Sequence, residues 1–288
     1  MDAFPIKTLS PEFIPKLFPD IPQQPKQIYY RGTLPPDGTT YLTVIGGRKC
    51  TPYGREACFH LIQGLRSYPV TIVSGLAFGT DTYAHEAALE AGLPIIVFPG
   101  SGLGDAVIYP RDNYQLAKRI LESGGCIMSE YTENQEATMW TFPQRNRLMA
   151  GIARAVLIIE AENKSGARIT TKLATDYNRD VLAVPGSIFS NMSEGTNQLL
   201  REGAIPILSV DNLLEAIGMK RTESSQAETL FANCSPEEQR VLHLLATPQP
   251  RGDLIRALNI PTHKAQILIS AMEIKGLVKE MMGMIGRG

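Results

Sequence analysis

The chain has 288 residues, of which 43% are hydrophobic, and its 28 Lys and Arg face 29 Asp and Glu for a net charge of -1. This length and composition predict a large buried core, with one main domain and a smaller one. The balanced charge excludes a strongly basic surface as the source of nucleic-acid binding, so any anion site has to be built locally.

The cysteines and the apolar runs narrow the class of protein further. Cys50, Cys58, Cys126 and Cys234 are scattered without metal-ligand spacing, and the N-terminus lacks the basic and apolar regions of a secretion signal. No apolar run reaches the length of a membrane-spanning helix. We therefore expect a soluble cytoplasmic protein that uses no metal, no cofactor and no membrane.

Residues 1–40 are rich in proline and show no sustained hydrophobic period, which predicts an extended N-terminal arm. The next segment, 41–218, alternates short apolar runs with amphipathic stretches. The apolar runs predict strands at Tyr41–Ile45, Thr71–Ser74, Ile95–Phe98, Cys126–Ser129, Ala155–Ile159 and Val181–Val184. The amphipathic stretches predict helices at Tyr53–Leu65, Thr82–Ala91, Asn113–Leu121 and Thr170–Tyr177. This alternation is typical of an α/β fold with a mostly parallel sheet and helices on both faces.

Glycine-rich turns follow most of the predicted strands. They place the following residues at the strand exits: Gly46, Gly47, Ser74, Gly75, Gly79, Gly100, Ser101 and Gly166. Ligands of parallel sheets bind beyond the carboxyl ends of the strands, and glycines let backbone N–H groups approach an anion. Although one such turn is more often structural, their recurrence at one edge favours a phosphate-binding rim. The spacing fits neither the G-x-G-x-x-G dinucleotide pattern nor a P-loop, which disfavours both NAD binding and P-loop hydrolysis.

The segment before the fifth strand combines aromatic and basic side chains. It holds the only tryptophan, Trp140, then Phe142 and the run Arg145-Asn146-Arg147. In one interpretation the aromatics are core residues and the arginines pair with carboxylates. In the other, an aromatic stacks on a base while arginines hold phosphates, as in proteins that bind single-stranded nucleic acid. The combination with the glycine rim favours the second interpretation.

The composition changes after the main domain. Residues 219–234 are polar and predict a linker, and residues 235–288 predict three helices followed by a short strand, an order that resembles a winged-helix domain. The third helix carries only Lys264 and Lys275, with Glu273 between them, so we do not expect it to read duplex DNA. A protein-contact or accessory role fits this domain at least as well.

Several motifs in the main domain resemble the DprA/Smf family, whose members are called DNA processing protein A. In chain order they are Gly46-Gly-Arg-Lys49, Thr51-Pro-Tyr-Gly54, Ser74-Gly-Leu-Ala77, Ile108-Tyr-Pro110, Ser129-Glu-Tyr131, Phe142-Pro-Gln-Arg-Asn-Arg147, Lys164-Ser-Gly166, Val184-Pro-Gly-Ser187 and Gly195-Thr-Asn197. The resemblance implies an extended Rossmann-like sheet with a small C-terminal winged-helix domain. It also implies a homodimer that binds single-stranded DNA, protects incoming DNA and loads the RecA recombinase in natural transformation, without an established catalytic activity.

The resemblance also implies which residues contact DNA. Carried over by motif, the candidates are Arg48, Phe142, Arg145, Asn146, Arg147, Lys164 and Ser165. The chain departs from the family pattern at Gly47, Phe78, Met139 and Gln144, where members often have a serine or a basic residue. Each departure removes a donor or a charge from the expected site, which predicts a weaker affinity for DNA.

Enzyme chemistry has weaker support in the sequence. His85 follows Asp81 by one helical turn, but such a histidine is usually a solvated residue on the helix surface. The serines of the glycine loops have no paired histidine, and Glu160 and Glu162 could simply balance neighbouring arginines. We therefore expect no catalytic residues and no enzyme activity. Two alternatives stay open: a nucleotide-binding sensor, and a nucleotide glycoside hydrolase of the lysine-decarboxylase-like type, whose Pro-Gly-Gly-x-Gly-Thr-x-x-Glu motif is incomplete here.

Overall fold

The computed structural model describes residues 3–19, 21–220, 234–245, 247–281 and 283–287. The chain divides into two compact units, residues 1–220 and residues 221–288, which are described separately. No described helix is long and apolar enough to cross a membrane. Most of the predicted linker, residues 219–234, lies outside the described residues.

The first unit is built on one nine-stranded sheet, in the order β1-β2-β6-β5-β4-β3-β7-β8-β9. The strands span Lys7–Thr8 (β1), Tyr29–Gly32 (β2), Thr40–Ile45 (β3), Val70–Ser74 (β4), Ile95–Val97 (β5), Cys126–Ser129 (β6), Ala155–Ile158 (β7), Asp180–Ala183 (β8) and Ile205–Pro206 (β9). All pairs from β6 to β9 are parallel, whereas β1 and β2 are added in antiparallel fashion. The predicted α/β fold with a mostly parallel sheet is confirmed.

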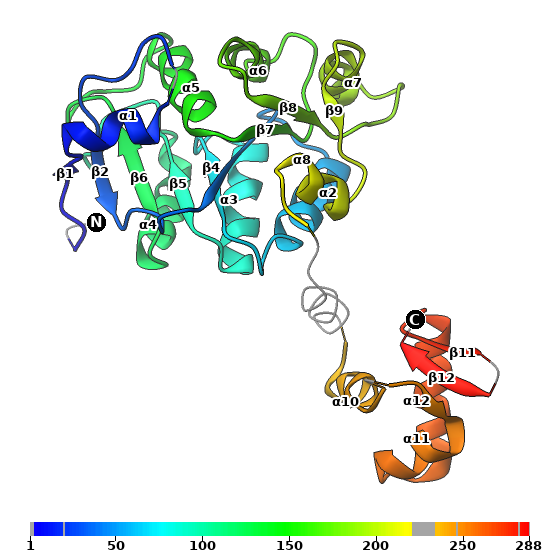
Figure 1. Ribbon diagram of the computed structural model, residues 1–288. Helices are drawn as coiled ribbons and strands as arrows, with labels where there is room; N and C mark the ends of the chain where they lie inside the picture. The colour runs from blue at the N-terminus through cyan, green and yellow to red at the C-terminus, as the bar shows by residue number, and fades with distance from the viewer. Residues whose placement is uncertain (1–2, 20, 221–233, 246, 282, 288) are drawn as a thin grey trace. The chain divides into compact units, whose positions relative to one another are not determined.

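Helices cover both faces of this sheet (Figure 1). One face carries α2 (Pro52–Gln63), α3 (Thr80–Ala91), α4 (Tyr114–Glu122) and α8 (Val210–Ala216). The other carries α1 (Ile14–Leu17), α5 (Thr141–Ile152), α6 (Ala167–Asp176) and α7 (Glu194–Arg201). Successive residues of a strand face opposite sides, so β3 sends Val44 into the first apolar core and Ile45 into the second. The site described below lies where the two layers meet the carboxyl edge of the sheet.

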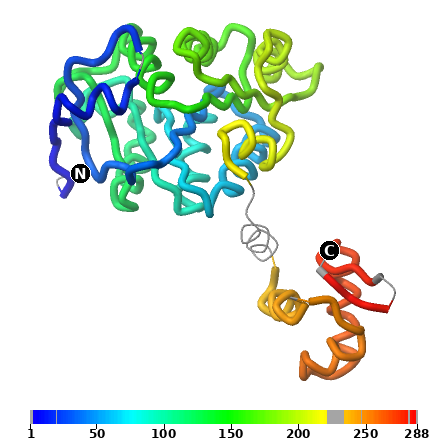
Figure 2. Tube along the Cα trace, viewed as in Figure 1, coloured from blue at the N-terminus to red at the C-terminus, as the bar shows by residue number. Residues whose placement is uncertain are grey.

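Residues 1–40 extend the sheet and are more than the arm expected from the sequence. β2 pairs with β6, with Tyr29 opposite Ser129, and β1 pairs with β2. Figure 2 shows this segment beside the β6 side of the sheet. Between the two strands, Phe18 is fully buried and its ring centre lies 6.2 Å from that of Phe98. The hydrophobic pattern of the sequence did not indicate β1 and β2, because both strands are short and lie among prolines.

The chain reverses its direction across the sheet at β3. From β3 it proceeds through β4 and β5 to β6 on one side, whereas β7, β8 and β9 lie on the other side. The loops that follow β3 and β7 therefore diverge, and open α/β sheets bind their ligands at such a switch point. Helix α2 begins there with a cap: the hydroxyl of Thr51 accepts a hydrogen bond from the N–H of Gly54 at 3.2 Å.

The second unit contains three helices and a small antiparallel sheet. The helices are α10 (Pro236–Leu244), α11 (Arg251–Leu258) and α12 (Thr262–Ile274), and the strands are β10 (Gln249–Pro250), β11 (Val278–Met281) and β12 (Met284–Arg287). The strands lie in the order β10-β12-β11. The three predicted helices and the strand that follows them are present, and the structure adds β10 and β12. The winged-helix assignment itself stays a prediction.

Candidate nucleic-acid interface

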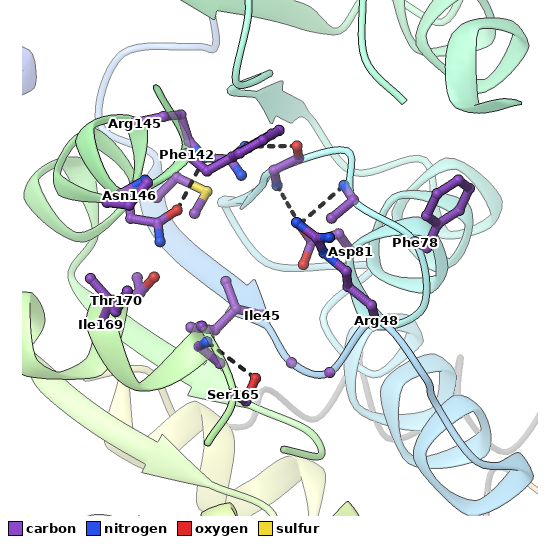
Figure 3. A pocket seen from close by; sticks show the side chains of 18 of the residues that line it. Ile45, Arg48, Phe78, Asp81, Phe142, Arg145, Asn146, Ser165, Ile169 and Thr170 are labelled. Atoms are coloured by element: carbon purple, nitrogen blue, oxygen red, sulfur yellow. Dashed lines mark hydrogen bonds between the residues drawn. The ribbon is translucent and has the colours of Figure 1, made fainter. Parts of the chain in front are cut away.

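A cleft of about 700 Å³ opens at the carboxyl ends of β3 and β4 (Figure 3). Its walls are the turn after β3, the loop after β4, helix α5 and the start of α6. It brings together the predicted site residues Arg48, Phe142, Arg145, Asn146, Ser165, Gly46, Gly47, Gly75 and Gly166. The predicted residues Arg147, Lys164, Ser74, Gly79, Gly100 and Ser101 do not line it.

Helix α5 supplies one wall of the cleft. Phe142, Arg145, Asn146 and Met149 line it and recur every three or four residues, the spacing of one helix face. The run from Arg145 to Arg147 therefore lies inside a helix, whereas the helices predicted from the sequence did not include this segment. Pro143 does not interrupt the helix because it falls in the first turn, where its missing N–H has no intrahelical partner in any case.

Arg48 and Phe142 approach each other across the cleft (Figure 3). The guanidinium carbon of Arg48 lies 5.8 Å from the centre of the Phe142 ring, within cation–π range. Arg48 is exposed and has no ion-pair partner among the described residues. The Phe142 ring rests on Gly100, where a Cβ atom would collide with it, and its centre lies 5.7 Å from that of Tyr109. The pair thus presents a cation with free donors beside a half-buried ring.

Arg145 is a buried part of the cleft wall. Its Nη1 donates to the carbonyls of Gly75 (2.7 Å) and Phe98, and its Nε donates to the side chain of Asn146 at 3.1 Å. A Cβ atom at Gly75 would collide with the guanidinium, so glycine permits this approach. Burial lowers the pKa of Arg145 to about 10, an effect that Asp81 opposes. Because its donors bind loop carbonyls, Arg145 braces the exits of β4 and β5.

Arg147 forms an ion pair outside the cleft. Its guanidinium binds the carboxylate of Glu130 after β6, and its Nη1 donates to the carbonyl of Gln23 at 2.6 Å. The two charged side chains are only 11% and 15% exposed. Burial raises the pKa of Glu130, against the lowering effect of Arg147. Arg147 thus ties α5 to the N-terminal segment, whereas the family resemblance implied that this residue contacts DNA.

Two buried carboxylates accept hydrogen bonds from backbone N–H groups near the strand exits. Glu160, after β7, accepts hydrogen bonds from the backbone N–H (2.8 Å) and the hydroxyl (2.7 Å) of Thr51 at the start of α2. Asp81, in the first turn of α3, accepts from the backbone N–H groups of Gly75 (3.2 Å) and Ala77 (3.3 Å). Burial raises the pKa of the Asp81 carboxyl. Many such sheets bind phosphate at the start of this helix and at this loop. Here the N–H groups of both places already bind carboxylates of the chain itself.

Other predicted rim residues also bond within the chain. The N–H of Gly47 donates to the carbonyl of Glu160 (2.7 Å), the hydroxyl of Ser74 donates to the carbonyl of Val44 (2.7 Å), and the hydroxyl of Ser165 accepts from the N–H of Ala167 (3.2 Å). Exposed positive charge comes from Arg48 and Lys49 at the cleft and from Lys164 next to Ser165. An external phosphate would therefore meet these side chains more readily than the glycine amides.

Exposed apolar side chains form a rim around the cleft, and the departures from the family pattern marked only Phe78 and Met139 among them. Phe78, Tyr109, Met139 and Ile169 line the cleft and are exposed. Phe78 and Met139 stood out in the sequence as losses of basic residues, whereas the structure shows that they supply apolar surface. No periodicity marked Tyr109, because it lies in the irregular stretch between β5 and α4.

His85 is buried, not solvated as the sequence suggested. It lies one turn after Asp81 on α3, is fully buried, and has no hydrogen-bond partner for either ring nitrogen among the described residues. Burial lowers its pKa to about 3, and Arg145 adds to this effect. The expectation failed because α3 packs closely against both the sheet and α2, which leaves this face no solvent. Across the described part of the chain, no group of three or more His, Cys, Asp or Glu is placed to hold a metal ion.

An open, mostly parallel α/β sheet with a cleft at its switch point defines the Rossmann-like class of ligand-binding domains. Residues 6–218 match the sequence model of the family described as DNA recombination-mediator protein A, and the chain belongs to this family. It is similar to the DNA processing protein DprA of Streptococcus pneumoniae, with 36% identity over 211 residues and 73% of each chain covered. It is also similar to Protein Smf of Escherichia coli K12, with 31% identity over 281 residues, 95% of this chain and 73% of that one.

Solved structures of two DNA processing proteins are among those that resemble the chain. The DNA processing protein A of Streptococcus pneumoniae has a TM-score of 0.68 and 35% identity, and the match covers 76% of this chain and 75% of that one. The DNA processing protein A of Helicobacter pylori, described for its single-stranded DNA binding mode, has a TM-score of 0.65 and 31% identity, over 74% of this chain and 96% of that one. The family resemblance drawn from the motifs is confirmed.

Proposed function

We propose that this chain binds single-stranded DNA in the cleft between α5 and the turn after β3. The observation that carries the proposal is the approach of Arg48 and Phe142 across that cleft, 5.8 Å apart. A ring beside a cation with free donors suits a base and its phosphate, the two parts that recur in every nucleotide of a single strand. The similar Helicobacter pylori protein, described for its binding of single-stranded DNA, supports the same ligand.

The contacts divide by chemistry. Arg48 in the cleft and Lys164, which lies beside it next to Ser165, bind phosphates. Phe142 stacks on a base, and Asn146 and Ser165 offer hydrogen bonds at the cleft wall. Arg145 and Arg147 hold that wall in place, because their guanidinium groups already bind partners within the chain. Among the described residues that line the cleft, none belongs to a helix placed for insertion into a major groove, so single strands should be preferred to duplex with little sequence selectivity.

Titration with labelled DNA tests the proposal. Oligo(dT), a mixed-sequence single strand and its duplex are compared by fluorescence anisotropy at several salt concentrations. We expect tighter binding of both single strands and an affinity that falls with salt as counterions are released. Phe142→Ala should lower the binding free energy by about 1–3 kcal/mol and leave the salt slope nearly unchanged. Equal affinity for duplex and single strand would contradict the proposal.

Nucleoside monophosphates separate DNA binding from the two alternatives. Because Glu160 and Asp81 fill the backbone donors of Thr51, Gly75 and Ala77 at the strand exits, a lone phosphate has fewer backbone contacts to gain there. We expect a nucleoside monophosphate neither to displace labelled oligo(dT) nor to release free base on incubation. Efficient displacement would favour a nucleotide sensor, and release of the base would favour a glycoside hydrolase.

The proposal includes the role that the family description names, recombination mediation. The chain would protect incoming single strands in natural transformation and load the RecA recombinase onto them, without catalysis of its own, as a cytoplasmic homodimer. Two linked clefts on one strand gain affinity through effective concentration. Faster RecA assembly on single strands coated with a single-strand-binding protein would support loading. A monomeric mass by light scattering at micromolar concentration would contradict the homodimer.

A further inference from the structure

The side chain of Trp140 stands in solvent at the edge of the cleft. It is 78% exposed, and its neighbour Met139 is 82% exposed. Among the described residues, no side-chain hydrogen bond, ring stacking or cation contact engages the indole. A tryptophan is on average well buried, and this indole adjoins Met139 of the exposed apolar rim of the cleft. A contiguous exposed apolar patch of this kind marks a surface that contacts a ligand.

Trp140 is continuous with the cleft. It is the N-cap residue of α5, and Pro143, one turn further along, lines the cleft together with Met139 and Phe142. Side chains three residues apart on a helix are neighbours, so the indole lies next to the cleft wall. The ring of Phe142 is already half-covered, partly by Tyr109, whereas the indole is largely uncovered. The first turn of α5 thus carries one ring inside the cleft and one outside it.

We propose that Trp140 is a second stacking site for single-stranded DNA, which receives the base next to the one held at Phe142. The inference rests on the proposed function and extends the path of the strand out of the cleft and over the first turn of α5. An indole presents a flat π face to any base, and its Nε1–H can donate to a phosphate or a base edge. Gln144, which follows Trp140 by one turn and is exposed, brings no negative charge to this path.

The chain contains one tryptophan, so its intrinsic emission reports on Trp140 alone. Titration of the full chain with unlabelled oligo(dT) should quench this emission in step with binding measured by anisotropy. In the matched control, Trp140→Phe is combined with Leu34→Trp. Leu34 is 38% exposed and lines a groove with Pro94 and Gly125, which precede β5 and β6, so it lies at the opposite edge of the sheet. The emission of this control should stay unchanged on binding.

Affinity provides the second readout. Trp140→Ala should weaken binding of oligo(dT) by about 5- to 150-fold, the factor that corresponds to one lost stacked base. The salt slope and the thermal stability should not change, because the side chain is exposed and uncharged. Trp140→Phe should retain most of the affinity. Binding with unquenched emission, and a Trp140→Ala variant at the parent's affinity, would overturn the inference while the proposed function stands. A parent chain that does not bind oligo(dT) at all would overturn both.

Discussion

The carboxylate of Glu160 closes the start of helix α2, where it lies 2.8 Å from the backbone nitrogen and 2.7 Å from the hydroxyl oxygen of Thr51. Gly54 permits this position, because a Cβ atom there would collide with the carboxylate. Glu160 comes from the exit of β7, so the contact joins the two sides of the switch point. The chain's own anion therefore stands where related sheets hold a ligand phosphate.

Glu160→Ala should lower the free energy of unfolding by about 1–3 kcal/mol, because a charged acceptor is lost and the N–H of Thr51 is left unpaired. Urea denaturation measures the change. Inorganic phosphate should restore part of the stability of the variant by binding at the emptied position, and should leave the parent chain unaffected. If phosphate does not shift the midpoint of the variant, Glu160 caps the helix without standing in for an anion.

Arg48→Ala should weaken binding of all single-stranded sequences alike, because the lost side chain contacts phosphates and not base edges. The slope of log affinity against log salt should become shallower by about 0.7, the value for one phosphate of a single strand. Arg66→Ala is the matched control, since Arg66 is also exposed but does not line the cleft. Both variants should keep the parent's thermal stability. An unchanged slope would remove Arg48 from the phosphate contacts.

Arg147→Ala should lower the stability of the fold more than it lowers the affinity for DNA. Loss of the guanidinium leaves the half-buried Glu130 without its partner and releases the carbonyl of Gln23, at a cost of about 1–3 kcal/mol. Arg154→Ala is the control, because its ion pair with Asp180 is exposed and should contribute less than about 1 kcal/mol. Chemical denaturation measures both changes, and limited proteolysis should show earlier cleavage in the N-terminal segment of Arg147→Ala. A stable variant with a shallower salt slope would instead return Arg147 to the phosphate contacts.

His85 should make the folded chain less stable in acid. Burial lowers its pKa to about 3 in the folded chain, whereas the unfolded chain has the ordinary value of 6.5, so the unfolded state binds more protons between these pH values. Stability is therefore complete above pH 6.5 and is lost as the pH falls toward 3. His85→Leu should flatten this part of the profile of unfolding free energy against pH. Equal slopes for the variant and the parent would assign the acid sensitivity to other groups.

The central strands were predictable because each is a short apolar run that the sheet buries on both faces. All six lie within one residue of their predicted bounds. The edge strands β1 and β2 were not predictable, since their own residues are not distinctive and their pairing depends on β6, far along the chain. Strand propensity is set largely by such neighbours.

The candidate site was predictable in outline only. Parallel topology indicated that the strand exits meet at one edge, and Arg48 and Phe142 do line one cleft there. The sequence could not show which N–H groups already have a hydrogen-bond partner, because Glu160 and Thr51 meet only after the whole sheet is assembled. The helical period of α5 could have separated Arg145 from Arg147, but the prolyl residue in its first turn concealed that helix.

The pairing of β2 with β6 has a consequence for how the domain is made. Residues of β2 leave the ribosome well before those of β6, so they wait without a partner while β3, β4 and β5 emerge. Contacts that close so long a loop form late. We therefore expect docking of the first residues to be a late step in folding, as is the pairing of β3 with β7. Until then β6 is an open edge that can pair with another nascent copy, so we expect removal of the N-terminal segment to promote aggregation.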